Sequence, residues 1–218
     1  MMKVKVLKNI TDMNDQLAAR NKDMFAGKGI LVINVMSSPG AGKTSLLLKT
    51  IELLGDDTRV GVIEGDIASS VDAEKIAATG SQAIQINTDG GCHLDANMVA
   101  SAADGLELDK LDIIFIENVG NLVCPAGFQL GEAKRVVLAS VPEGDDKPTK
   151  YPFMFQDTDV IVITKMDYLP LSDFNMESFR KTVTGLNPDV KIIELSVRNG
   201  QGLDEWISWL KSNLLKRK

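Results

Sequence analysis

Seven short apolar runs rich in β-branched residues alternate with amphipathic helical patterns, and this alternation constrains the fold more than any other feature of the sequence. Most runs are apolar at every position rather than at every second one, which is typical of parallel strands covered by helices on both faces. The runs stand at residues 30–36, 59–64, 83–86, 113–118, 135–141, 160–164 and 191–196. We therefore predict a doubly wound α/β fold with a mainly parallel, seven-stranded sheet and helices on both faces.

The first 28 residues carry no strand pattern. Their apolar residues recur at spacings of three, four or seven, as on one face of a helix: Ile10, Met13, Leu17, Met24 and Phe25. Either Thr11 or Asp12 can cap such a helix. We predict an amphipathic helical arm over residues 1–28, followed by one domain over residues 29–218. Within that domain, the Asp-, Gly- and Pro-rich segment 142–149 is expected to be a mobile surface connection.

The charge and composition of the chain exclude several classes of partner. With 30 acidic and 24 basic residues, the net charge is −6, so the chain lacks the field that holds a nucleic acid. The apolar runs are far shorter than the ~18 residues that span a bilayer, so no membrane partner is expected. Two cysteines are too few for a disulfide scaffold and fit a reducing compartment. We expect a cytoplasmic protein.

A glycine-rich loop stands between the first predicted strand and a helical run. Its small residues let backbone N–H groups and the following helix N-terminus surround phosphate groups. Lys43 is expected to neutralise phosphate charge, and the Thr44 hydroxyl to bind Mg²⁺. Ser37 replaces the usual first glycine, but the rest of the pattern stays in register. The sequence thus predicts a P-loop nucleoside triphosphatase whose loop contacts nucleotide through Ser38, Pro39, Gly40, Ala41, Gly42, Lys43, Thr44 and Ser45.

Carboxylates follow two of the predicted strands at the edge where parallel sheets bind ligands. Glu117 follows the four apolar residues 113–116, and Gly120 comes three residues later. We expect Glu117 to hold Mg²⁺, usually through water, and the Gly120 N–H to contact the γ-phosphate as part of a switch. Asp66 and Asp72 supply further carboxylates for Mg²⁺ or the attacking water. Either aspartate can instead cap the helix that begins near residue 71. With Lys43, these four residues form the candidate catalytic set.

Two later segments resemble the base-reading motifs of GTPases. Thr164-Lys165-Met166-Asp167 is similar to the Asn-Lys-x-Asp motif, in which the aspartate accepts from two guanine donors and the lysine covers the base. Thr164 replaces asparagine, so we expect a weaker bracing hydrogen bond to the base or the P-loop. Ser196, Val197 and Arg198 resemble the fifth motif, whose backbone contacts guanine O6. The resemblance implies binding of GTP and GDP.

The soft ligands of the chain fall in two loops. The single histidine, His93, adjoins Cys92, and the other cysteine, Cys124, lies seven residues after Glu117. Two thiolates and an imidazole suit Ni²⁺ or Zn²⁺, and either residue type alone would more often be structural. Three ligands leave the ion at least one ligand short of four, and water or a second subunit can supply the missing ligand. We expect a site shared across a dimer.

Several stretches together resemble the HypB family, the nickel-incorporation GTPases of [NiFe]-hydrogenase maturation. They are Asn87-Thr88 with Cys92-His93-Leu94-Asp95-Ala96, the run from Glu117 to Pro125, Glu143-Gly144-Asp145-Asp146, and Lys150-Tyr151-Pro152. The resemblance implies a GTPase of the SIMIBI class that forms a homodimer with nucleotide and carries Ni²⁺ or Zn²⁺ on Cys92, His93 and Cys124. It also implies a HypA-type metallochaperone as partner and the hydrogenase large subunit as recipient. No Cys or His precedes residue 92, so nickel storage is not expected.

The hypothesis is a metal-binding GTPase that cleaves GTP to GDP and phosphate to gate nickel delivery. Slow basal turnover is expected, because no arginine finger can be placed in the sequence. Within the same class, the alternatives are chaperone GTPases of urease or of cobalamin enzymes. The separated Cys-His and Cys-Pro segments disfavour both. A small-molecule kinase is disfavoured by the guanine motif, and a metal protein with a merely regulatory nucleotide site remains open.

Overall fold

A seven-stranded, entirely parallel sheet forms the centre of the molecule in the computed structural model, which describes residues 12–215. Its strands lie in the order β3-β2-β4-β1-β5-β6-β7. They are β1 (Leu31–Ser37), β2 (Val60–Asp66), β3 (Gln82–Asn87), β4 (Ile113–Glu117), β5 (Lys134–Ser140), β6 (Val160–Thr164) and β7 (Lys191–Glu194). All seven predicted strands are present, and the predicted fold class is confirmed.

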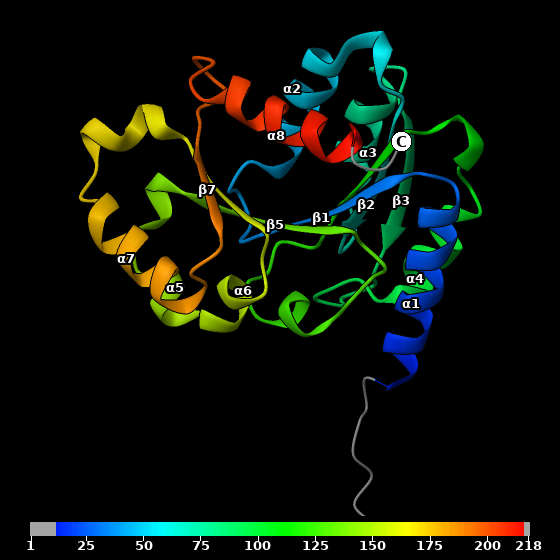
Figure 1. Cartoon of the computed structure of the whole chain (residues 1–218), viewed down its shortest axis with the longest axis horizontal. Helices are drawn as coiled ribbons and strands as arrows, with labels where there is room; N and C mark the ends of the chain where they lie inside the picture. The colour runs from blue at the N-terminus through cyan, green and yellow to red at the C-terminus, as the bar shows by residue number, and fades with distance from the viewer. Residues whose placement is uncertain (1–11, 216–218) are drawn as a thin grey trace, which may run out of the picture.

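Helices cover both faces of this sheet (Figure 1). Helices α2 (Lys43–Leu54), α3 (Val71–Ala77) and α8 (Leu203–Leu215) lie on one face. The other face carries α1 (Asp12–Gly27), α4 (Ala96–Ala103), α5 (Lys147–Lys150), α6 (Pro152–Gln156) and α7 (Met176–Leu186). Five short 3₁₀ helices complete the described part of the chain: η1 (Gly55–Asp57), η2 (Leu108–Lys110), η3 (Cys124–Gly127), η4 (Val141–Glu143) and η5 (Met166–Leu171). No helix within residues 12–215 is long and apolar enough to cross a bilayer.

The central strand β1 shows why the sheet carries helices on both faces. All seven of its residues are buried, and its alternate side chains enter different cores. Leu31, Ile33 and Val35 pack with α2 and α8, whereas Val32 packs with α1 and α4. Burying an aliphatic side chain of this size contributes ~1.5–3 kcal/mol, so both faces of the strand stabilise the sheet. β1 lies between β4 and β5 in the sheet. In parallel α/β sheets of this kind, ligands bind in the crevice at the carboxyl ends of the central strands.

The described part of the expected N-terminal arm forms a helix, and its buried face includes the expected Phe25, with Leu17 and Met24 half-buried. Ala18, Asn21 and Phe25 are buried against the domain, at a helical spacing of three and four. Met13, expected on the apolar face, is 75 % exposed. The expected positions Ile10 and Thr11 lie outside the described residues. A buried asparagine on this face indicates polar contacts that apolar spacing does not reveal.

The segment 142–149 folds into two helical turns, η4 and α5. The side chain of Glu143 accepts hydrogen bonds from the backbone N–H and the hydroxyl of Ser140, at 3.1 and 2.5 Å, and so closes η4 at its start. Pro148, in the first turn of α5, is buried. The expectation of a mobile connection did not anticipate this local structure, because the Gly and Pro signals mark turns without specifying their side-chain contacts.

Candidate functional site

The phosphate-binding loop joins β1 to α2. Gly42 has a φ of 100°, a left-handed conformation that glycine adopts at little cost, and it turns the chain into the helix that begins at Lys43. The Lys43 ammonium lies 3.3 Å from the Ser37 hydroxyl and 3.9 Å from the Glu117 carboxylate. Ser37 also donates to the Ser38 carbonyl at 2.6 Å. The serine that departs from the usual glycine therefore helps to hold the lysine.

Three carboxylates meet beside Thr44. Glu64, Asp72 and Glu117 each place an oxygen within 4.8 Å of the others. Glu64 and Glu117 are register partners on β2 and β4, so the parallel sheet itself sets them side by side. The Thr44 hydroxyl lies 2.9 Å from Glu117 and 3.0 Å from Asp72. The arrangement concentrates acidic oxygens at the N-terminus of α2.

The electrostatics of this cluster fit a divalent cation. Burial raises the pKa of Glu64 to about 10, and it also raises the pKa of Glu117. Glu64 and Glu117 each keep one buried carboxylate oxygen without a hydrogen-bond partner. Thr44 has one hydroxyl proton and therefore donates to only one of its two carboxylates. Hard cations such as Mg²⁺ take oxygen ligands of this kind, so the donor set matches the expected metal.

The two predicted aspartates have different surroundings. Asp72 is half-buried in the cluster and also pairs with Lys75 at 2.7 Å, while Ser70 occupies the N-cap of α3. Asp66 accepts from the N–H groups of Ala68 and Ser69, at 3.0 and 2.8 Å, so it shapes the loop that follows β2. Both line a cavity of about 440 Å³ next to the P-loop. The structure brings Asp72, but not Asp66, into the carboxylate cluster.

Gly120 lies against the phosphate loop. A Cβ at this position would stand 3.0 Å from both the Cα and the N of Pro39. Such contacts are tighter than most side chains make, so glycine lets the two backbones approach without displacing Pro39. The segment after β4 is therefore in direct contact with the P-loop, as a segment that senses the γ-phosphate requires.

A second cavity, of about 510 Å³, adjoins the first along Gly42 and Ser45. Asp167 is mostly buried in its wall, where it accepts a hydrogen bond from the Ser196 hydroxyl at 2.6 Å. Arg198 approaches the same carboxylate at 3.7 Å. Besides Gly42 and Ser45, the cavity is lined by Ala41, Pro142, Thr164, Lys165, Asp167, Tyr168, Ser196, Val197 and Arg198. All the predicted base-reading residues thus surround one space.

Thr164, which replaces the usual asparagine, makes one bracing hydrogen bond. Its hydroxyl donates to the carbonyl of Ala41 in the P-loop at 2.7 Å. Lys165, at a left-handed φ of 58°, donates to the carbonyl of Gly40 at 2.7 Å. Threonine therefore still braces the P-loop, because the short distance between β6 and the loop suits a short side chain.

The three predicted soft ligands come together. Cys92, His93 and Cys124 each place a ligand atom within 4.8 Å of the others, and all three are half-buried. The neighbouring Cys92 thiol raises the pKa of Cys124, and partial burial lowers the pKa of His93. Phe128 stacks on the His93 ring with a centroid separation of 3.9 Å. Two thiols and a largely neutral imidazole form a suitable donor set for Ni²⁺ or Zn²⁺.

Asn118 connects the two clusters. It follows Glu117 directly and is buried, and its side-chain oxygen accepts from the N–H groups of Leu94 and Val119 at 3.2 and 3.0 Å. Beyond it, Asn121 accepts from the N–H of Cys124 at 3.3 Å. One buried amide therefore ties the strand that carries the acidic cluster to the loop that carries Cys92 and His93.

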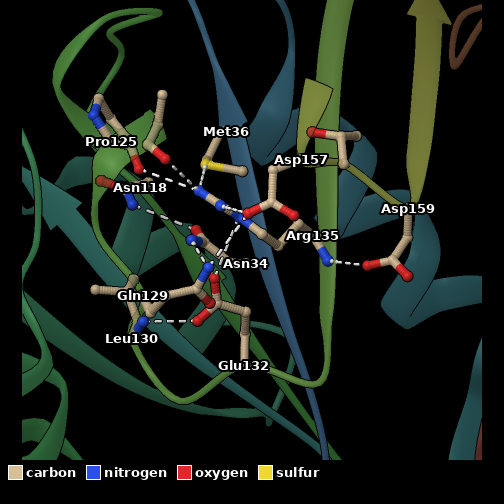
Figure 2. A network of polar contacts seen from close by, with 12 residues as sticks. Asn34, Met36, Asn118, Pro125, Gln129, Leu130, Glu132, Arg135, Asp157 and Asp159 are labelled. Carbon is tan, nitrogen blue, oxygen red and sulfur yellow. Dashed lines mark hydrogen bonds and ion pairs between the residues drawn. The ribbon is translucent and has the colours of Figure 1, made fainter. Parts of the chain in front are cut away.

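A buried polar network lies behind the Cys124 loop (Figure 2). Arg135 donates to the carbonyls of Pro125 and Ala126, both at 3.2 Å, and pairs with Asp157 at 2.6 Å. Glu132 lies beside Arg135, at 3.4 Å, and accepts from the amide of Asn34 at 3.3 Å. The backbone that follows Cys124 is therefore held by hydrogen bonds from the buried Arg135.

Sequence reasoning missed three residues of the site. Glu64 ends an apolar run just as Glu117 does, so the argument applied to Glu117 would have identified it. Glu143 accepts a short hydrogen bond from the Ser38 hydroxyl of the P-loop, in addition to its bonds to Ser140. Phe128 gives no sequence signal for its stacking on His93, because that contact depends on how two distant loops meet.

Comparisons with known proteins agree with this geometry. Residues 31–194 match the family described as CobW/HypB/UreG, nucleotide-binding domain. The hydrogenase maturation factor HypB of Azotobacter chroococcum is 49 % identical over 95 % of this chain and 68 % of its own length. A crystal structure of HypB from Helicobacter pylori in complex with nickel has a TM-score of 0.90 and 38 % identity, covering 94 % of this chain and 96 % of that one. HypB from Archaeoglobus fulgidus has a TM-score of 0.87, also at 38 % identity, covering 93 % and 98 %. The chain belongs to the HypB family of P-loop nucleotide-binding proteins.

Proposed function

We propose that this protein hydrolyses GTP to GDP and phosphate and uses the nucleotide state to gate the delivery of nickel during [NiFe]-hydrogenase maturation. The observation that carries the proposal is the Asn118 bridge between the acidic cluster and the Cys92–His93 loop. Through this bridge, the end of the strand that carries Glu117 is bonded directly to the loop that carries Cys92 and His93. The relatives support the pathway, since those compared above are named HypB and one was solved with nickel.

The base is bound in the 510 Å³ cavity. Asp167 presents its carboxylate oxygens to the guanine N1 and N2 donors, and the Ser196 hydroxyl, which donates to the same carboxylate, orients it. Adenine offers no such pair of donors, so the carboxylate favours guanine. Lys165 and the backbone of Ser196, Val197 and Arg198 complete the base pocket.

The triphosphate lies along the P-loop and reaches the acidic cluster. Lys43 and the N–H groups at the start of α2 neutralise the phosphate charge. Mg²⁺, held by Thr44, Asp72, Glu117 and the newly identified Glu64, would offset the charge that develops on the phosphate oxygens. Asp72 is the less buried of these carboxylates and orients the attacking water, while the Gly120 N–H contacts the γ-phosphate. We expect slow basal turnover, because no arginine lines the 440 Å³ cavity beside the P-loop.

The metal carried by Cys92, His93 and Cys124 is Ni²⁺ as cargo, with Zn²⁺ as the competing ion. Three ligands leave a tetrahedral or square-planar ion incomplete, and a second copy of the chain supplies the missing contact in a nucleotide-promoted homodimer. Release of the γ-phosphate relaxes the contact between Gly120 and Pro39. Movement of that segment shifts Cys124, which follows Gly120 by four residues. A HypA-type metallochaperone then passes nickel to the hydrogenase large subunit.

The proposal is tested by single-turnover GTP cleavage and Ni²⁺ titration on the same protein. We expect cleavage without any acceptor substrate, loss of tight nucleotide binding in Lys43→Ala, and in Asp72→Ala a larger loss of cleavage than of affinity. Cys124→Ala should lose Ni²⁺ affinity and keep GTP cleavage. Cleavage only in the presence of a metabolite acceptor would indicate a kinase. Unchanged Ni²⁺ affinity in Cys124→Ala would contradict the proposed role of this cysteine in metal binding.

A further inference from the structure

One polar face of α1 is aimed at both loops that carry the soft ligands. Asn14 and Asn21 stand seven residues apart, two helical turns, so their side chains share one face. Asn14 is half-buried and Asn21 is 4 % exposed. A buried asparagine in a short surface helix requires hydrogen-bond partners. Those partners lie 75 to 115 residues away in the sequence.

The first loop is held at Ala96, three residues after His93. The Asn14 carbonyl oxygen accepts from the Ala96 N–H at 2.9 Å, and the Asn21 amide donates to the Ala96 carbonyl at 2.8 Å. Both backbone groups of this residue are therefore bound by α1. Because Ala96 is buried and begins α4, the bonds fix the point where the Cys92–His93 loop enters a helix.

The second loop is held at residues 129–130, just after Phe128. The Asn14 amide donates to the carbonyl of Gln129 at 2.9 Å, and the Asn21 amide uses its second hydrogen for the carbonyl of Leu130 at 3.0 Å. Phe128 itself stacks on His93. The two asparagines thus bind both ligand loops at once, and each of them bridges the two.

α1 packs so closely against the second loop that the loop has no room for a side chain at Gly131. A Cβ on Gly131 would lie 2.4 Å from the Cβ of Asn21 and 2.9 Å from the carbonyl of Ala18. On the opposite side, Glu132 accepts from the N–H of Leu130 at 2.7 Å (Figure 2). The carbonyl of Leu130 is therefore bonded to α1, and its N–H is bonded to Glu132 in the buried network around Arg135.

We propose that α1 is a clamp for the metal site, in which Asn14 and Asn21 are positioning residues that set the separation between Cys92 and Cys124. The inference rests on the proposed metal role of Cys92, His93 and Cys124, and it assigns a function to a helix that contributes no ligand. Since both loops are bonded to one rigid helix, their relative position depends on two amide groups. Loss of one amide removes one of the two bridges and leaves the loops joined by the other asparagine, by Asn118 and by the contact between Phe128 and His93.

The test compares Asn14→Ala and Asn21→Ala with Asn187→Ala. Asn187 is a matched control, because its amide also donates to a distant backbone carbonyl, that of Thr158, at 2.8 Å, but between α7 and β6. Each variant is titrated with Co²⁺, whose thiolate charge-transfer and d–d absorption report ligand number and geometry. GDP affinity and urea unfolding are measured on the same samples.

We expect Co²⁺ affinity to fall about tenfold or more in Asn14→Ala and Asn21→Ala, as is usual when groups that orient metal ligands are removed. The absorption of bound Co²⁺ should also change, while GDP affinity stays within about twofold of the parent. Asn187→Ala should keep both the affinity and the spectrum, even where its stability falls. If the parent binds Co²⁺ and the two clamp variants lose no more Co²⁺ affinity than Asn187→Ala, the clamp is refuted. Asn14→Ala keeps the test decisive if Asn21→Ala does not fold.

A metal-free measurement separates the clamp from the proposed metal function. In redox buffers of glutathione, the ratio of disulfide to dithiol for Cys92 and Cys124 gives the effective concentration of one thiol near the other. We expect this concentration to fall severalfold in both clamp variants and to stay constant in Asn187→Ala. If the parent binds no Co²⁺ but the clamp variants still lose effective concentration, the metal function fails and the clamp stands. An unchanged ratio in all variants overturns the clamp.

Discussion

The side-chain oxygen of Asn118 accepts a hydrogen bond from the backbone N–H of Leu94 at 3.2 Å. Asn118 directly follows Glu117, whose carboxylate contacts Thr44 at the P-loop, and Leu94 directly follows His93. One buried amide therefore lies between the residue next to the acidic cluster and the residue next to His93. This relationship offers a physical route by which nucleotide and metal affinity can depend on each other.

Removing this amide should uncouple the two sites. In the parent protein we expect Ni²⁺ affinity to differ between GDP and a non-hydrolysable GTP analogue by about 5–150-fold, the usual range for coupled sites. Asn118→Ala should reduce the difference, because the Leu94 loop then no longer follows the strand end. Paired Ni²⁺ titrations at matched dimer fraction measure both values, with Asn187→Ala as the control. Equal affinities in the two nucleotide states of the parent would contradict the coupling itself.

Base recognition should follow the acceptor oxygens of Asp167. Asp167→Asn replaces one acceptor with a donor, which faces a guanine donor and leaves a buried polar group unpaired at a cost of ~1–3 kcal/mol. We expect GDP affinity to fall by about tenfold or more and xanthosine diphosphate to become the preferred ligand. Ser196→Ala, which removes the 2.6 Å bond to this carboxylate, should weaken GDP binding without changing the preference. Unaltered GDP binding in Asp167→Asn would show that guanine does not bind at Asp167.

The buried carboxylate Glu64 should make the stability of the metal-free protein fall with rising pH. Its folded pKa is raised to about 10 from an ordinary value near 4.5, chiefly by burial and then by the charge of Glu117. Between these values the folded protein holds a proton that the unfolded chain releases, so each pH unit lowers the free energy of unfolding by up to about 1.4 kcal/mol. Glu64→Gln carries no such charge and should flatten the slope.

Urea unfolding in EDTA at pH 6 and pH 8.5 measures this slope, with the exposed Glu177→Gln as control. The variant should be relatively more stable than the parent at the higher pH. Adding Mg²⁺ should stabilise the parent more at pH 8.5 than at pH 6, because the cation replaces the proton. Parallel slopes in parent and Glu64→Gln would show that this carboxyl is already ionised in the folded protein.

Glu143 should be needed for nucleotide affinity although it lies outside the P-loop. Its carboxylate accepts from Ser38 of the loop and from Ser140 at the end of β5. Hydrogen bonds to a charged group contribute ~1.5–3 kcal/mol, so Glu143→Ala should weaken GDP binding by about tenfold through a less ordered loop. Calorimetric titration with GDP measures the effect. Glu177→Ala, at an exposed position of α7, should bind GDP as the parent does, and an equal loss in both variants would assign the effect to general destabilisation.

The sequence by itself determined the sheet and identified most of the candidate site residues. The seven strands are readable because parallel strands buried on both faces must be apolar throughout. Lys43, Thr44 and Asp167 are readable because phosphate and guanine recognition need particular groups at fixed spacing within a few residues. Cys92, His93 and Cys124 are identifiable by scarcity, since they are the only soft ligands in the chain apart from methionine.

The tertiary structure decided how distant segments support these groups. Glu64 becomes a partner of Glu117 only through the register of β2 with β4, and Thr164 reaches the P-loop only because β6 ends near Ala41. Met13 is exposed while Asn21 is buried, contrary to the apolar spacing of α1, because this helix is held by backbone groups of two loops. Local patterns report which residues avoid water and which bind phosphate. They contain no information about which distant carbonyl a buried amide meets, since that depends on the three-dimensional path of the chain.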